Sequence, residues 1–69
     1  MANKAQLSFD PNEDLTIYVV QLVFDGRLFN LGTIFKGPVG SEFQQRKTYR
    51  LNADEMIQIA DFMKTIEGR

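Results

Sequence analysis

The chain has 69 residues, enough for one domain, and a chain of this length buries only about 60% of the surface that its unfolded form exposes. It contains no cysteine and no histidine, which excludes disulfides, catalysis by either residue and the usual zinc sites, so we expect no enzyme, no metal and no cofactor. The net charge of −1 argues against a strongly basic nucleic-acid-binding domain, and the polar residues 1–6 lack an apolar signal core, so the expected compartment is the cytoplasm.

Two units are expected along the chain. Residues 1–14 form an N-terminal segment, in which Leu7 to Phe9 is expected as a short edge strand before the turn-rich acidic stretch that follows. Residues 15–69 are expected to form a single sheet-plus-helix domain. Its first part, Leu15 to Phe24, is rich in Val, Ile and Tyr and predicts a strand, and the run is too short and too interrupted to span a membrane as a helix.

A hairpin is predicted next, because Asp25-Gly26 favours a tight turn between two apolar runs. Arg27 to Phe35 is the expected returning strand, and the glycine within it, Gly32, indicates a bend or a bulge. Strict alternation predicts one face with Leu28, Asn30, Gly32 and Ile34 and another with Phe29, Leu31, Thr33 and Phe35. After a glycine-rich loop, alternation resumes from Glu42 to Leu51 and predicts a last strand.

A C-terminal helix is predicted to begin after Asn52, whose side chain can accept from the backbone amide of Glu55 while that carboxylate reaches back, as in a capping box. Gly68 is the expected stop. The apolar stripe of the helix repeats every three or four residues and should pack in the core or at a dimer interface; it contains Met56, Ile59, Phe62 and Met63, with Ala60 and Ile66.

Both faces of the long hairpin are apolar. Tyr18, Val20, Leu22 and Phe24 alternate with Ile17, Val19 and Val23. One helix can cover only one of these faces, and a large uncovered apolar patch usually marks an interaction site, so we expect a homodimer.

Charge and aromatic residues are combined in the middle of the chain. Residues 1–26 carry a net charge of −3, residues 27–50 carry +4 and residues 51–69 carry −2. Exposed rings can stack on bases and cations attract phosphates, so interleaved aromatic and basic residues are typical of surfaces that bind single-stranded nucleic acid. Taken one at a time, each phenylalanine is expected in the core, and basic residues on a strand edge also protect against aggregation. Only their combination favours the functional interpretation.

The order and spacing of these motifs resemble the single-strand-binding domain of the transcriptional coactivator positive cofactor four. That family has an aromatic and basic hairpin turn, a Gly-Arg-Lys approach to its last strand and a Leu-Asn or Leu-Thr-Pro-Glu helix start. Here the resemblance covers residues 15–66 and rests on Tyr18 to Phe24, Asp25-Gly26-Arg27, the Gly-Pro-Val-Gly loop, Arg46-Lys47 and Leu51-Asn52.

The resemblance implies roles for individual residues. Phe24 matches the turn aromatic that stacks on a base, and Arg27 matches the basic residue after the turn glycine. Lys47 matches the basic residue that enters the last strand, and Arg46 matches the residue beside it. The chain departs from the family at several positions. Asp25 stands where the family has a lysine, Thr33 near a family arginine, and Phe35 or Lys36 where a tryptophan is expected. Ala53-Asp54-Glu55 replaces the Pro-Glu-Gln opening of the helix. These departures remove cations, which predicts weaker affinity or a ligand other than DNA.

The sequence therefore predicts an α+β fold, in which a curved four-stranded antiparallel sheet is followed by one C-terminal helix. The resemblance implies a homodimer with its helices packed together and paired channels that bind single-stranded DNA or RNA without strong sequence preference. Such a protein would act in transcription, replication or recombination, in the cytoplasm or with the nucleoid. The candidate binding residues are Phe24, Arg27, Phe29, Phe35, Lys36, Arg46, Lys47 and Arg50.

The alternative is a small protein-interaction module, such as an inhibitor or adaptor of a replication or transcription machine, that uses the apolar sheet face. The acidic overall charge favours this alternative, whereas the cluster of five cations between residues 27 and 50 favours nucleic-acid binding.

Overall fold

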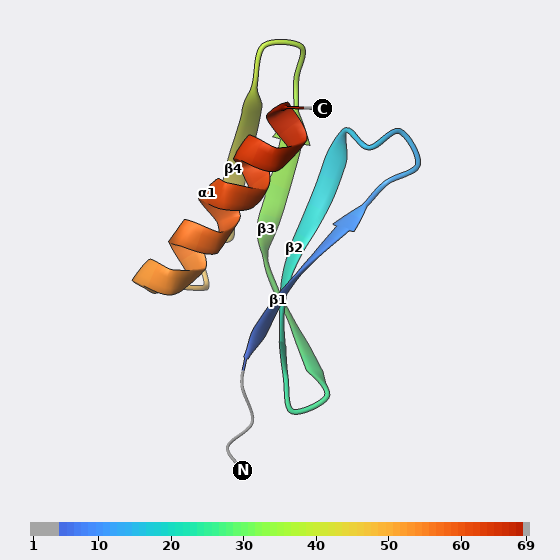
Figure 1. Cartoon of the computed structure of the whole chain (residues 1–69). Coiled ribbons are helices and arrows are strands. Elements are labelled where there is room, and N and C mark those ends of the chain that lie inside the picture. The colour runs from blue at the N-terminus through green and yellow to red at the C-terminus, as the bar shows by residue number, and fades with distance from the viewer. Residues whose placement is uncertain (1–4, 69) are drawn as a thin grey trace.

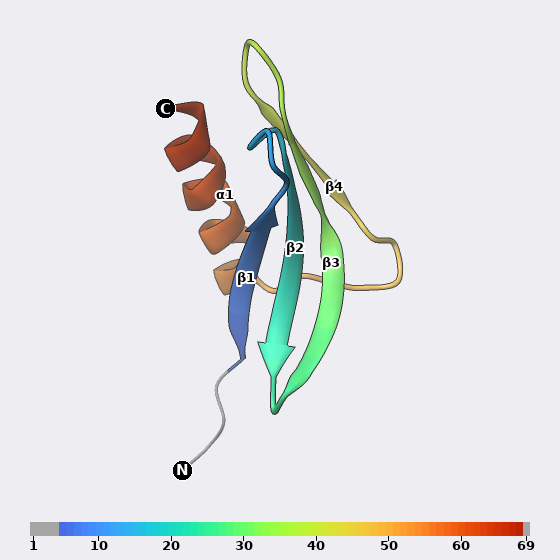
Figure 2. The same cartoon turned by 90° about the vertical axis from the view of Figure 1, so that its right-hand side faces the viewer.

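The computed structural model describes residues 5–68, which form an open antiparallel sheet followed by a single helix (Figure 1). The strands are β1 (Gln6–Pro11), β2 (Ile17–Phe24), β3 (Arg27–Lys36) and β4 (Ser41–Gln45), and the helix is α1 (Ala53–Glu67). Each strand pairs with the next in chain order, and α1 lies on one face only (Figure 2). The predicted α+β fold, an antiparallel four-stranded sheet followed by one C-terminal helix, is confirmed.

No helix within residues 5–68 is long and apolar enough to cross a membrane. The expectation that no signal core is present concerned residues 1–6, of which residues 1–4 lie outside the described part of the chain.

The connection between β1 and β2 is organised by Asn12. Its side-chain oxygen accepts from the backbone amides of Thr16 and Ile17 at 3.0 and 3.3 Å, and its backbone amide donates to the Ile17 carbonyl at 2.9 Å. Leu15 has a φ of +59° inside this loop. The prediction that β2 begins at Leu15 is therefore wrong by two residues, because a left-handed residue cannot continue a pleated strand.

A β-bulge in β3 changes which residues share a face. Val20 pairs with Gly32 and Gln21 with Asn30, so Leu31 has no partner on β2. The strict alternation predicted for this strand is consequently wrong. Phe29, opposite Leu22, shares the helix-facing side with Leu31 and Ile34, whereas Leu28, Asn30, Thr33 and Phe35 share the opposite side. The bulge that Gly32 predicted is confirmed.

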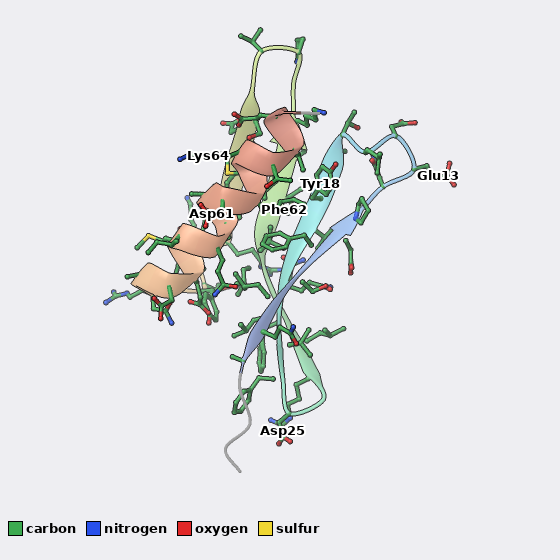
Figure 3. The ribbon with its side chains drawn as sticks, viewed as in Figure 1. Glu13, Tyr18, Asp25, Asp61, Phe62 and Lys64 are labelled. Atoms are coloured by element: carbon green, nitrogen blue, oxygen red, sulfur yellow. The ribbon has the colours of Figure 1, made fainter. Side chains whose placement is uncertain are left out.

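The core lies between the helix-facing side of the sheet and α1. Tyr18, Val20, Leu31 and Ile34 from the sheet are buried with Ile59 and Ile66 from the helix. The ring of Phe62 stacks on Phe9, with centroids 4.1 Å apart, and meets the edge of Tyr18 at 5.1 Å (Figure 3). Met63 packs beside this cluster, but Met56 is 53% exposed, so the expected burial of the whole stripe is wrong for Met56 in the single chain.

The helix begins with the predicted capping box. Asn52 accepts from the Glu55 amide at 2.8 Å, and its own amide donates to the Glu55 carboxylate at 2.9 Å. Glu55 is only 7% exposed and also accepts from the Tyr49 hydroxyl at 3.1 Å. Desolvation by burial, with the hydrogen bond to Glu55 and its charge, raises the pKa of Tyr49. At the other end the amide of Gly68 donates to the Lys64 carbonyl, which confirms the predicted stop.

The last strand is shorter than predicted. β4 ends at Gln45, and a turn follows in which the Tyr49 amide donates to the Arg46 carbonyl at 3.2 Å and Gln45 Nε2 donates to the Tyr49 carbonyl at 2.7 Å. The alternation of apolar and polar residues continues past Gln45 because Tyr49 and Leu51 pack against the core, although both lie in a loop. The predicted strand from Glu42 to Leu51 is therefore wrong beyond Gln45.

Candidate nucleic-acid interface

The β2–β3 hairpin brings two aromatic rings and a cation together. Asp25 and Gly26 both have positive φ, +50° and +73°, as the tight hairpin turn that matches strand twist requires. This turn places Phe24 directly opposite Arg27, and the register places Leu22 directly opposite Phe29. Because residues two apart on a strand share a face, Phe24, Arg27 and Phe29 lie on the same side of the sheet.

These rings are accessible because the hairpin extends beyond the helix. Phe24 is 41% exposed and Phe29 is 42% exposed, although both lie on the side of the sheet that α1 covers elsewhere. Figure 3 shows Asp25 at the tip of the hairpin, far from the labelled helix residues Asp61 and Lys64. Leu7 and Leu22, half-buried and paired with each other, lie beside Phe29. We call this group the hairpin surface: Leu7, Leu22, Phe24, Arg27 and Phe29.

The predicted cations after β4 lie on a loop and not on a strand. Arg46, Lys47 and Arg50 are all exposed. The Arg46 amide donates to the Leu31 carbonyl at 2.9 Å, so the loop starts two residues, or about 7 Å along β3, from Phe29. Figure 2 shows the loop swinging away from the helix side and then returning past β3 to the start of α1. The loop thus begins beside the bulged part of β3, and its three cations are exposed.

Arg46 differs from the other two loop cations. Its backbone bond to Leu31 continues the β3–β4 ladder by one residue, so alternation from Phe43 and Gln45 places its side chain on the face opposite to theirs. That is the face opposite to Phe24 and Phe29. Lys47 and Arg50 follow the end of the ladder, so strand alternation does not assign their side chains to either face.

Phe35 and Lys36 are not brought to this site. They lie at the other end of β3, roughly 25–30 Å along the strand from Arg27. Phe35 pairs with Ile17 and Glu42 on the face away from the helix, and the Lys36 amide donates to the Thr16 carbonyl at 2.7 Å. The sequence analysis grouped these two residues with the hairpin because they are an aromatic and a basic residue in the same part of the chain. The structure places them at the opposite end of β3.

Sequence reasoning missed Leu7 and Leu22 as part of the site. Leu7 is opposite Leu22, and Leu22 is opposite Phe29, so the three form an apolar row across three strands. The only signal for this row was the alternation within each strand, and its assembly depends on the register between strands. The row thus joins Phe29 to apolar side chains of β1 and β2 on the same face.

The chemistry available at the site is stacking and charge attraction. The four exposed cations of the hairpin and the loop outnumber the three exposed acids nearby in sequence, Asp25, Glu42 and Asp54. Within residues 5–68, no cluster of three or more histidine, cysteine, aspartate or glutamate side chains is placed to hold a metal ion. Exposed rings beside cations can bind the faces of bases and their phosphates.

A second apolar surface lies on the other side of the sheet. It includes Leu28, which is 62% exposed, with Ile17, Val19, Val23 and Phe35, and we call it the outer face. None of the strand positions on this side of β2 and β3 carries a cation.

No family model, curated protein or solved structure matches this chain. The resemblance to positive cofactor four stays a prediction from sequence motifs.

Proposed function

We propose that the protein binds single-stranded nucleic acid on the hairpin surface, with bases stacked on Phe24 and Phe29 and phosphates held by Arg27, Lys47 and Arg50. The observation that carries the proposal is the pair of exposed rings on one sheet face with Arg27 directly opposite Phe24, at a place that α1 leaves uncovered. Stacking is tolerant of sequence, because every base has a face that fits a ring. Binding without strong sequence preference follows. We place this activity in transcription, replication or recombination, in the cytoplasm or at the nucleoid.

The exposure of the two rings supports this proposal against a core role for them. A phenylalanine in a small domain is normally buried, and the buried core here is formed by other residues of the same strands. Phe24 and Phe29 are diagonal neighbours across β2 and β3, since Phe24 is two residues beyond the partner of Phe29. Diagonal positions are about 7–8 Å apart, close enough for aromatic side chains to act as one platform.

The distribution of charge supports the phosphate contacts. The net charge is −1, but residues 27–50 carry +4, and all four cations of the hairpin and loop are exposed. Contacts to phosphate from so few cations give moderate affinity that falls as salt rises. This accounts for nucleic-acid binding by a chain that is acidic overall.

The proposal is tested by replacing a ring without creating a cavity in the core. Phe24→Leu keeps an apolar side chain but removes the aromatic face, so it should weaken binding of a fluorescent oligothymidylate by about 1–3 kcal/mol, roughly 5- to 150-fold in Kd. The measurement is fluorescence anisotropy at low salt, with the unfolding curve of each variant recorded alongside.

Leu28→Ala is the matched control, because Leu28 is on the neighbouring strand of the same hairpin but on the outer face. It should leave the oligonucleotide Kd unchanged. Equal losses for the two variants, or no loss for Phe24→Leu with the fold intact, would contradict the proposal.

Protein interaction through the outer face is the second candidate function. It is favoured by one observation, the exposed Leu28 and Phe35 on a sheet face whose β2 and β3 positions carry no cation. If the wild-type protein fails to bind any oligonucleotide at low salt, the inhibitor or adaptor function becomes the better account. Leu28→Asp should then abolish binding to the protein partner while leaving the fold intact.

A further inference from the structure

β4 is an edge strand whose outward backbone groups can be identified. Backbone bonds join Arg46 to Leu31 and Gly37 to Gly40, on either side of the β3–β4 pairing. Hydrogen-bonded pairs alternate along an antiparallel ladder, so Glu42 and Gln44 bond to β3. The amides and carbonyls of Ser41, Phe43 and Gln45 therefore point to the open side.

Only part of this edge is available. The amide of Ser41 already donates to the side chain of Glu67, at the end of α1, at 3.0 Å. Phe43 and Gln45 retain outward groups, and β4 contains no proline and no lysine to discourage pairing. The open part of the edge is thus two outward-facing residues long.

An apolar groove runs beside this edge on the helix-facing side. It has a volume of about 220 Å³ and lies between β4 and α1. Phe43, Leu51, Met56, Ile59, Ala60 and Met63 line it. Met56, which is 53% exposed, is in its wall.

The charges of β4 select one occupant, a second copy of the same chain. In an antiparallel pair of two β4 strands, outward residues must face outward residues, which allows registers centred on each residue from Ser41 to Gln45. Centring on Ser41 needs the amide that already donates to Glu67, and centring on Gln45 sets neutral Gln44 opposite Arg46. Centring on Glu42 sets two glutamates opposite each other, which is destabilising, and centring on Phe43 sets Glu42 opposite neutral Gln44. Centring on Gln44 sets Glu42 of each chain opposite Arg46 of the other, twice.

We propose that two copies of this chain pair through β4, antiparallel about Gln44, and form one continuous eight-stranded sheet. Phe43 of each copy exchanges two backbone bonds with Gln45 of the other, four in all, and none requires the Ser41 amide that Glu67 occupies. The two-fold axis is perpendicular to the sheet, so both helices lie on one face and the two apolar grooves adjoin. Glu42 and Arg46 are both exposed and form the two cross-strand ion pairs.

Site-directed crosslinking tests the register directly, because the native chain has no cysteine. At the proposed register the two Gln44 residues form a non-hydrogen-bonded pair with Cα atoms about 4.5 Å apart, within the range that a disulfide spans. Gln44→Cys should therefore form a disulfide-linked dimer under mild oxidation. Glu42→Cys is the matched control on the same strand and face, and its two thiols would be about 13 Å apart.

Charge reversal is the second, independent test, measured as the dimer dissociation constant by sedimentation equilibrium. Glu42→Arg and Arg46→Glu each replace two attractions by two repulsions and should raise that constant on the order of tenfold, while the double variant should restore it. Selective crosslinking at position 44 with restoration by the double variant supports the interface. Crosslinking at position 42 as fast as at 44, no restoration, or a wild-type chain that stays monomeric at all concentrations would overturn it. Neither test uses nucleic acid, so the proposed function stands or falls separately.

Discussion

Replacing Gly32 by alanine should cost this domain a large part of its stability. A Cβ built on Gly32 would lie 2.3 Å from the carbonyl oxygen of Gln44 and 2.7 Å from the ring of Phe43. The first of these atoms belongs to the backbone of β4, so the clash can be relieved only by moving strands β3 and β4 apart. Gly32 also has a φ of +157°, a conformation that residues with a side chain rarely adopt.

The two effects can be estimated together. Overpacking costs about 1–3 kcal/mol and an unfavourable backbone conformation about 1–3 kcal/mol, so the sum is roughly 2–6 kcal/mol. A domain of 69 residues has a total stability of roughly 3–10 kcal/mol. Gly32→Ala should therefore lower the urea midpoint severely or leave the chain unfolded at room temperature.

The assay is urea unfolding followed by circular dichroism, with Gly40→Ala as the control. A Cβ on Gly40 would meet nothing within 4 Å, so this variant should unfold within about 0.5 kcal/mol of the wild type. If Gly32→Ala unfolds at the same urea concentration as Gly40→Ala, the close approach of β4 to the bulge does not exist as described.

Three further predictions concern the helix and its start. The pKa of Tyr49 is raised above 10.0 in the folded state, so the fold is more stable while the phenol is protonated. The free energy of unfolding should therefore fall as pH rises past about 10. Tyr49→Phe should flatten this pH dependence, measured by urea titrations at several pH values. Glu55→Ala removes the reciprocal cap and the bond to Tyr49, and should lower the free energy of unfolding by about 1–3 kcal/mol, whereas the exposed Asp54→Ala should change it much less. Ile59→Asp places an unpaired charge in the core and should abolish the cooperative thermal transition; a soluble variant with a wild-type melting curve would refute the packing of α1.

Local signals predicted most of the fold. The hairpin at Asp25-Gly26 and the cap at Asn52 each depend on a few adjacent residues, and the structure has both where the sequence places them. The order of the strands in the sheet was not part of the prediction; in the structure each strand pairs with the next in the chain, as short connections favour. The apolar period of the helix identified Ile59, which is buried, for the same local reason.

Features that depend on contacts between distant segments were not predicted. The bulge at Leu31 shifts the register by one residue, and this reverses the face assigned to Phe29 relative to Ile34. The end of β4 was missed because Tyr49 and Leu51 keep the alternation of a strand while packing from a loop. At the bulge the period of two failed for the side chains themselves, whereas after Gln45 it held for the side chains and misled only about the backbone.

The candidate site shows the same division. Phe24 and Arg27 face each other across a tight turn, so their proximity could be predicted from the sequence. Phe35 was grouped with them by residue type, although it lies at the far end of β3 on the opposite face. Alternation along residues 42–51 predicts Arg46 on the face opposite to Phe43, and its backbone bond to Leu31 keeps it in the ladder on that face.

The salt dependence of oligonucleotide binding tests the central claim most directly. With phosphates on Arg27, Lys47 and Arg50, the logarithm of the association constant should fall with the logarithm of salt concentration with a slope of about −2 per chain, and Arg27→Gln should reduce that slope by about 0.7. Lys64→Gln, on the helix and far from the hairpin tip, should leave the slope unchanged (Figure 3). No binding by the wild type at low salt, or the same slope for Arg27→Gln as for the wild type, would contradict nucleic-acid binding by the hairpin surface.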